Sequence, residues 1–428
     1  ILLWITVICL RRHRRQRQIP LSLAPHQKNL TDNPCRNSVL LLIIFFSLLA
    51  NANTYFPDSD WSTASPENFG IKPSKVKNLI DLSFEDESTL GVVLIKNGKI
   101  IGEQYADGYD YLSHGTSWSM AKSYYAALIG VSIDRGEIKS LDDPVKEYLD
   151  YFDDERGLIT IRDLLNMSSG LEFPDHEHEK MFFQKDHLSY AKGVGVEKPS
   201  GKKFEYNNVN SMIIGDILLK ATGKRADILL GERILKPIGV TDYKLWKDEA
   251  GNVMAYCCVD MSIRDYSRIG LLFSRNGYWN GKQIIPKDFI DETFQVVWET
   301  PNRFSNHKRY YSLHWWVSKF DQEGRIFNTS GKFGQYTFVD RTNDVIFTRV
   351  TKYDQNNHGD VQKWGPLQYF RWLGVTQAIK TARVLLNFNL IENGTDVITP
   401  TTDSKGESDE FYNNYQKVVE GIADLSRG

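Results

Sequence analysis

Short apolar runs separated by polar turns recur along most of the chain, and their spacing predicts both helices and strands. Residues 90–95 and 100–105 are two such runs on either side of an Asn-Gly pair, which is a strong β-hairpin signal. Ahead of them, apolar residues at helical spacing predict an amphipathic helix over 75–84 that Ser74 caps. The fold is therefore expected to begin with a helix and an antiparallel strand pair.

The pattern becomes mainly helical from Ser119 to about residue 236. Small and apolar residues over 119–130 predict a helix that is buried on all sides. Strand-like runs then return in the last third of the chain, over 311–317, 325–328, 336–339 and 345–350. Helical patterns follow over about 364–387, and a short helix is expected at the C-terminus within an extension over 376–428.

Residues 175–201 form the least regular stretch, which we interpret as a long loop that folds over a site. It contains His176-Glu177-His178-Glu179, a set of metal-binding residue types. The two histidines lack the i, i+4 spacing that places two ligands on one helical face, so a solvated loop is the better interpretation. We predict no metal and no cofactor.

Composition is that of an ordinary globular protein. The chain has 428 residues, 41% of them hydrophobic, and a formal net charge of −2. This length suits one large domain or two closely packed ones, and this charge gives no reason to expect a nucleic acid partner.

The N-terminal region, residues 1–52, has the features of a leader. Residues 39–50 form a 12-residue apolar run behind Arg36, and Ala50-Asn51-Ala52 is a small-x-small cleavage site. These features predict a signal peptide cleaved after Ala52 and a periplasmic or secreted product. The alternative is an uncleaved inner-membrane anchor, with membrane contact only through this leader, although 12 residues are short for a span.

Four cysteines are present, Cys9, Cys35, Cys257 and Cys258. Adjacent cysteines rarely form an unstrained disulfide, so Cys257 and Cys258 are expected to be small buried thiols.

Ser119 and Lys122 are the strongest candidates for catalytic chemistry. Three residues apart on a helix, they lie on one face, and burial of the helix would lower the lysine pKa enough for it to act as a base. The Ser-x-x-Lys pattern is weak alone, because the chain contains it five times: at 74/77, 119/122, 189/192, 200/203 and 305/308. Only the pair at 119/122 opens an apolar helix. The alternative is a core helix with a capping serine.

Tyr206 and Asn208 lie at a predicted loop-to-helix junction, where side chains can point into a cleft. The same Tyr-x-Asn spacing occurs at 278/280 and 412/414, so position in the fold decides in favour of Tyr206. The alternative for Tyr206 is a packed aromatic residue whose hydroxyl bonds a backbone group. Further on, glycines within 329–335 would let a substrate approach a strand backbone closely.

Three motifs occur in the order found in the penicillin-recognising serine hydrolases. They are Ser119-Met120-Ala121-Lys122, Tyr206-Asn207-Asn208 and Thr329-Ser330-Gly331. With supporting phrases at 161–171 and 236–239, the chain resembles the class C β-lactamase-related group over about residues 65–375. Residues 254–258 and 331–335 make it most similar in appearance to 6-aminohexanoate-dimer hydrolases.

The resemblance implies an α/β (α+β) fold in which an antiparallel sheet is flanked by helices. The sheet would come from both ends of the domain, about 65–115 and 305–375. A mainly helical part, about 119–300, would be inserted between them.

The resemblance also implies roles for individual residues. Ser119 would be the acylated nucleophile, Lys122 its proton acceptor and Tyr206 the group that passes protons to the leaving group. Asn208 would bond the substrate or the lysine. Substrate and oxyanion contacts would come from Ser330, Gly331 and Lys332, with the backbone N–H groups of Ser119 and Lys332 facing the oxyanion.

One position departs from the pattern of true β-lactamases, which carry a lysine where this chain has Thr329. The expected function is therefore a serine hydrolase that cleaves a small-molecule amide or ester. The alternatives are β-lactamase or D,D-peptidase activity and a non-catalytic, penicillin-binding-like sensor.

Overall fold

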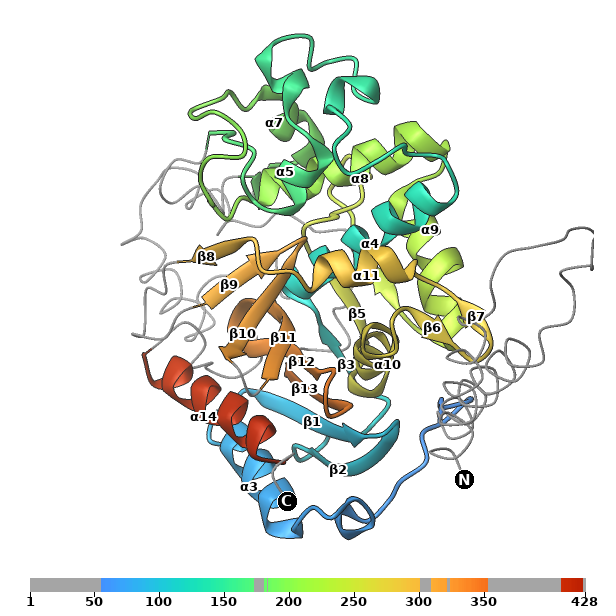
Figure 1. Ribbon diagram of the computed structural model, residues 1–428, viewed down its shortest axis with the longest axis vertical. Helices are drawn as coiled ribbons and strands as arrows, with labels where there is room; N and C mark the ends of the chain where they lie inside the picture. The colour runs from blue at the N-terminus through green and yellow to red at the C-terminus, as the bar shows by residue number, and fades with distance from the viewer. Residues whose placement is uncertain are drawn as a thin grey trace, which may run out of the picture. The chain divides into compact units, whose positions relative to one another are not determined.

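The computed structural model describes residues 55–172, 181–182, 184–300, 309–321, 324–352 and 409–425 (Figure 1). The chain divides into two units, residues 1–55 and 56–428, and the fold described here is that of the second. Three predictions concern residues that lie outside those described: the leader, the histidine-containing stretch 176–179 and the helix over 364–387. The predicted domain limits therefore remain predictions.

An eight-stranded antiparallel sheet forms the centre of the unit, with strands from its two ends as neighbours (Figure 1). The strands in spatial order are β2 (Lys99–Tyr105), β1 (Thr89–Lys96), β13 (Val345–Thr351), β12 (Gln335–Asp340), β11 (Gly324–Gly331), β10 (Trp315–Asp321), β9 (Arg309–Ser312) and β8 (Trp298–Thr300). The predicted hairpin is confirmed, since Asn97 and Gly98 join β1 to β2 with φ of 51° and 79°.

The single strand predicted over 311–317 is wrong, because the chain reverses inside it. Leu313 and His314 take positive φ values of 39° and 63° and form a two-residue turn between β9 and β10. Neither residue type signals such a turn, whereas Asn-Gly does. Because the run is apolar throughout, its sequence predicts one continuous strand and gives no signal for the hairpin.

Each face of the sheet is covered by helices because side chains alternate along its strands. Val92 and Leu94 of β1 join one apolar core with helices α3 (Pro73–Phe84) and α14 (Asp409–Leu425), which lie side by side (Figure 1). The neighbouring residues of β1 join the other core, with α4 (Ala121–Asp134) and α10 (Ile263–Ser274). Helix α3 starts before Ser74, with Lys72 at its N-cap, so the predicted serine cap is wrong.

A mainly helical part follows α4, as predicted. Its helices are α5 (Ile161–Leu165), α7 (His187–Gly193), α8 (Asn208–Thr222), α9 (Ala226–Leu230) and α11 (Lys287–Thr293). Strand β3 (His114–Thr116), which precedes α4, forms a small sheet with β5 (Val259–Ser262) and β4 (Lys244–Leu245), and β6 (Tyr278–Trp279) pairs with β7 (Lys282–Gln283). Helix α7 lies in the stretch predicted as one long loop, so that prediction fails there.

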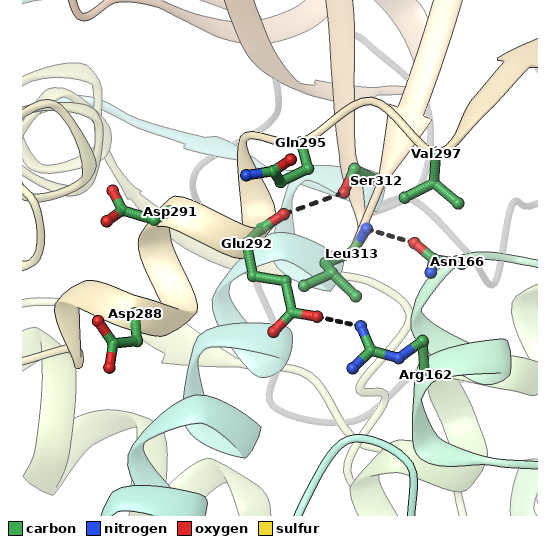
Figure 2. A pocket seen from close by; sticks show the side chains of 9 residues that line it. All are labelled: Arg162, Asn166, Asp288, Asp291, Glu292, Gln295, Val297, Ser312 and Leu313. Carbon is green, nitrogen blue, oxygen red and sulfur yellow. Dashed lines mark hydrogen bonds and ion pairs between the residues drawn. The ribbon is translucent and has the colours of Figure 1, made fainter.

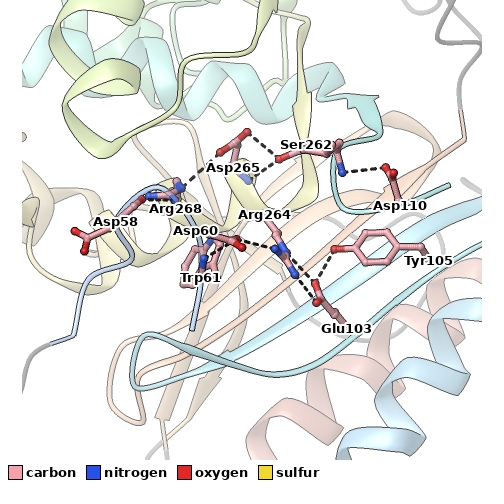
Figure 3. A network of polar contacts seen from close by, with 11 residues as sticks. Asp58, Asp60, Trp61, Glu103, Tyr105, Asp110, Ser262, Arg264, Asp265 and Arg268 are labelled. Atoms are coloured by element: carbon pink, nitrogen blue, oxygen red, sulfur yellow. Dashed lines mark hydrogen bonds and ion pairs between the residues drawn. The ribbon is translucent and has the colours of Figure 1, made fainter. Parts of the chain in front are cut away.

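A polar network holds α10 to the sheet and to the segment that leads into α3 (Figure 3). Arg264 bonds Glu103 of β2 at 2.6 Å and Asp60 at 2.8 Å, and the Tyr105 hydroxyl donates to Glu103 at 2.7 Å. Arg268, also on α10, donates to the Ile238 carbonyl at 3.0 Å. These contacts give the start of α10 a structural role.

Candidate active site

Ser119 lies in a 3₁₀ turn, η2 (Trp118–Met120), that leads directly into α4. The turn is anchored to β5 by two hydrogen bonds, from the Ser117 N–H to the Val259 carbonyl at 2.8 Å and from the Val259 N–H to the Ser117 hydroxyl at 2.9 Å. Trp118 takes a left-handed φ of 47° before the serine. Ser119 itself is half-buried while both neighbours are buried, so its hydroxyl remains accessible on a fixed backbone.

Lys122 is buried beside it, with 1% of its surface exposed. Its Nζ lies 2.9 Å from Ser119 Oγ and donates to the Tyr256 carbonyl at 2.6 Å. Among the described residues, no carboxylate lies within ion-pair distance of this amine. Burial therefore lowers the pKa of Lys122 well below its ordinary value. A neutral amine can accept a proton from the adjacent hydroxyl.

Tyr206 is the third member of the group and comes from the loop before α8. Its ring stacks on Trp316 with centroids 5.7 Å apart and meets the Tyr311 ring edge-on at 6.1 Å. Lys122 Nζ lies 5.1 Å from the Tyr206 ring centroid. Burial raises the pKa of Tyr206 to about 12, while a hydrogen bond with the Ser119 side chain acts in the opposite direction. The structure thus brings the predicted hydroxyl, amine and phenol together.

The third motif lies at the end of β11, directly against the nucleophile turn. A Cβ on Gly331 would lie 2.2 Å from the Ser117 carbonyl oxygen, so only glycine allows this approach. Ser330 is half-buried, whereas Thr329 is buried on the opposite face of the strand. Lys332 begins the next turn, η7 (Lys332–Gly334), with its amine 6.0 Å from the Trp118 ring centroid.

Asn208 is the first residue of α8, two positions after Tyr206. The cap of that helix is Asn207, whose side-chain oxygen accepts a hydrogen bond from the Val209 N–H at 2.9 Å. The substrate-binding role of Asn208 and the oxyanion role of Lys332 remain predictions.

Two further residues contact the site, and the sequence patterns predict no role there for either of them. Tyr256 contributes its carbonyl to Lys122, whose Nζ also lies 5.7 Å from the Tyr256 ring centroid, and the Tyr256 hydroxyl lies 2.9 Å from His187 Nδ1. His314 lies behind the site, 3.0 Å from the Ser211 hydroxyl, and burial followed by the charge of Lys122 lowers its pKa to about 3. A backbone oxygen cannot be recognised in a motif, and a lone histidine in an apolar run is usually a core residue.

Cys257 and Cys258 are buried next to Tyr256, as predicted. The structure places their sulfur atoms against each other, and the expectation that they are free thiols remains a prediction. In the part of the chain that the structure describes, no three His, Cys, Asp or Glu side chains gather as a metal site.

A separate cavity of about 510 Å³ lies between α5, α11 and the β9–β10 turn (Figure 2). Its wall includes Asn166, whose side-chain oxygen accepts a hydrogen bond from the Leu313 N–H at 2.9 Å, and Arg162, which pairs with Glu292. Ser119, Lys122 and Tyr206 do not line it. The candidate site is therefore defined by the three converging side chains and not by this cavity.

An antiparallel sheet with a helical insert, and a serine and lysine at the start of the buried helix between them, define the class of penicillin-recognising hydrolases. Comparison with protein families matches residues 84–367, more than half of the chain, to the family named Beta-lactamase. The chain belongs to the beta-lactamase family. Members of this family act as hydrolases on small-molecule amides or esters.

Individual relatives agree with this assignment. The chain is 28% identical over 176 residues to a D-aminopeptidase from Brucella anthropi, a match that covers 37% of this chain and 33% of the relative. A Bacillus anthracis structure provisionally named 6-aminohexanoate-dimer hydrolase superposes with a TM-score of 0.60 at 18% identity, over 94% of this chain and 98% of the other. The structure of an octameric penicillin-binding protein homologue from Pyrococcus abyssi superposes with a TM-score of 0.55 at 17% identity. The match covers 65% of this chain and 72% of the other. The family resemblance and the fold class expected from the motifs are confirmed.

Proposed function

We propose that this protein is a serine hydrolase that cleaves an amide or ester through an acyl-enzyme on Ser119. One observation supports this most strongly: the Lys122 amine lies 2.9 Å from Ser119 Oγ in a buried setting that lowers its pKa. A serine hydroxyl becomes a useful nucleophile only when a neutral base is within reach, and a surface lysine would be charged.

In the proposed acylation step, Lys122 takes the proton of Ser119 as Oγ attacks the substrate carbonyl. The carbonyl oxygen becomes an oxyanion, which the backbone N–H groups of Ser119 and Lys332 would face. Tyr206 then gives its proton to the leaving amine or alcohol as the bond to the carbonyl carbon breaks. With a pKa of about 12, Tyr206 holds that proton at neutral pH.

Deacylation would reverse these roles with water. Tyr206, left as a phenolate by the first step, would accept a proton from water as the water attacks the acyl carbon. Ser119 would recover its proton from Lys122 as the acid departs. Every proton is then restored to its starting group.

The preferred substrates are linear amides and esters of the kind cleaved by 6-aminohexanoate-dimer hydrolases or esterases. The similarity to a D-aminopeptidase supports amide hydrolysis. β-Lactamase or D,D-peptidase activity is the second candidate, but the residue at the β-lactamase lysine position, Thr329, is buried and uncharged. A non-catalytic sensor is the third.

A pair of serine variants tests the proposal. Ser119→Ala should abolish hydrolysis of p-nitrophenyl esters, because the nucleophile is removed. Ser200→Ala is the matched control, since Ser200 and Lys203 have the same spacing in the sequence but Lys203 is exposed. Unchanged activity in Ser119→Ala, with the protein folded, would place the nucleophile elsewhere.

We also propose that the protein is exported and cleaved after Ala52. The apolar run over 39–50 and the small residues at 50 and 52 support this. Among the described residues, no helix has both the length and the apolar character to cross a membrane. N-terminal sequencing of the exported protein tests the proposal, and an intact segment 39–52 would contradict it.

A further inference from the structure

Arg309 is a cation beside the candidate site to which neither the motifs nor the comparisons assign a role. It is the first residue of β9, and its carbonyl accepts a hydrogen bond from the Thr300 hydroxyl at 3.2 Å. The guanidinium carbon lies 3.8 Å from the centroid of the Trp316 ring. Trp316 in turn stacks on Tyr206. The guanidinium group and the phenol of the site therefore contact the same aromatic ring.

The charge of Arg309 is not neutralised by a described neighbour. Among the residues that the structure describes, no Asp or Glu pairs with this side chain, and its Nε is shielded from solvent without a hydrogen-bond partner. Its described neighbours are aromatic: Trp316, and Tyr415 of α14, whose ring centroid lies 5.9 Å away. The positive charge also opposes the upward shift of the Tyr206 pKa, which places it within electrostatic range of the phenol.

These features suit recognition of a substrate anion. A guanidinium group is planar, always charged, and matches a carboxylate with two parallel hydrogen bonds. The Trp316 ring against which it packs, and the hydrogen bond between its side chain and Tyr415, restrict its orientation and reduce competition from water. The leaving group is the part of the substrate that Tyr206 would protonate, so an anion near Arg309 belongs to that part.

We propose that Arg309 binds a carboxylate on the leaving group of the substrate. The substrate class is then amides and esters whose leaving group is an amino acid or a hydroxy acid. This inference rests on the proposed hydrolase function and deepens it. Helix α14 contributes through Tyr415, so a part of the chain beyond the family match would help to form this substrate subsite.

The test compares two acetate esters that differ in one charge, those of 3-hydroxybenzoate and of its methyl ester. For the wild-type protein, kcat/KM should be at least about tenfold higher for the carboxylate ester, on the scale of one charge-assisted hydrogen bond. Arg309→Met should remove that preference mainly through KM, and Arg309→Lys should retain part of it. Arg135→Met is the matched control, because Arg135 is exposed and follows α4 at the end about 20 Å from Ser119.

Two results would overturn the proposal. One is an unchanged ratio of the two kcat/KM values in Arg309→Met. The other is an equal fall for both esters, which would show that Arg309 only supports the Trp316 and Tyr206 stack.

A binding measurement separates this inference from the proposed function. In Ser119→Ala, calorimetry with 6-acetamidohexanoate should detect binding, and the double variant with Arg309→Met should lose it. Binding without hydrolysis of either ester would contradict the hydrolase function and support the carboxylate subsite. No binding to Ser119→Ala would overturn the subsite.

Discussion

Replacing Lys122 by Met should raise stability, because a buried amine without a carboxylate partner is costly to the fold, and it should lower activity, because the proposed base is removed. Its side chain is 1% exposed, and burial lowers its pKa well below the ordinary value. Methionine has a similar length and no charge. We expect kcat/KM to fall by about 10²–10⁴-fold, the usual contribution of a general base.

The pH dependence of the stability difference gives the magnitude. Between the folded-state pKa of Lys122 and its unfolded value of about 10.4, the unfolded chain binds one more proton than the folded chain. In that window the Lys122 amine therefore makes the free energy of unfolding of the wild-type protein rise by about 1.4 kcal/mol per pH unit. The variant has no amine at this position and lacks this rise. The advantage of Lys122→Met should accordingly be largest at the lower end of the window and shrink as the pH approaches 10.

Urea unfolding of both proteins at several pH values between about 7 and 10 measures this difference. The loss of the bond to the Tyr256 carbonyl costs the variant about 1–3 kcal/mol at every pH, so it shifts the difference without changing its slope. A difference that stays constant over this range would refute the reasoning, since it would show that Lys122 titrates alike in the folded and unfolded chains.

Two further predictions concern the geometry of the site. Tyr206→Phe should keep the ring stack on Trp316 and lower the rate of acylation by about two orders of magnitude or more, measured as the single-turnover release of the amine from a linear amide; a near-normal rate with that amide would exclude a proton-transfer role. Gly331→Ala should displace the nucleophile turn, because its Cβ would lie 2.2 Å from the Ser117 carbonyl oxygen. The variant should still fold but have a lower kcat, and a wild-type kcat in the folded variant would contradict this.

The early part of the fold was predictable from sequence because its signals are local. Asn97 and Gly98 demand a tight hairpin, and Thr160 with Asp163 forms the capping box that starts α5. The β9–β10 turn was missed because Leu313 and His314 have no preference for positive φ. Their turn is held by distant partners: the Leu313 N–H donates to Asn166, and the His314 carbonyl accepts from the Ser123 hydroxyl at 2.6 Å.

The sequence predicts only those parts of the candidate site in which reactive side chains stand at a fixed spacing along the chain. Ser119 and Lys122 are neighbours on one helical turn, so their contact follows from local geometry. Tyr206 required the order of three motifs along the chain. The Tyr256 carbonyl and the stack of Arg309 on Trp316 depend on how β9, β10 and the segment before β5 are placed in space, which no local pattern encodes.

The most direct test of the central claim is the mass of the protein after reaction with a fluorophosphonate, followed by peptide mapping. The proposed mechanism predicts one covalent adduct located on Ser119, absent from Ser119→Ala and greatly slowed in Lys122→Met. Folded wild-type protein that forms no adduct, or an adduct on another residue, would contradict it.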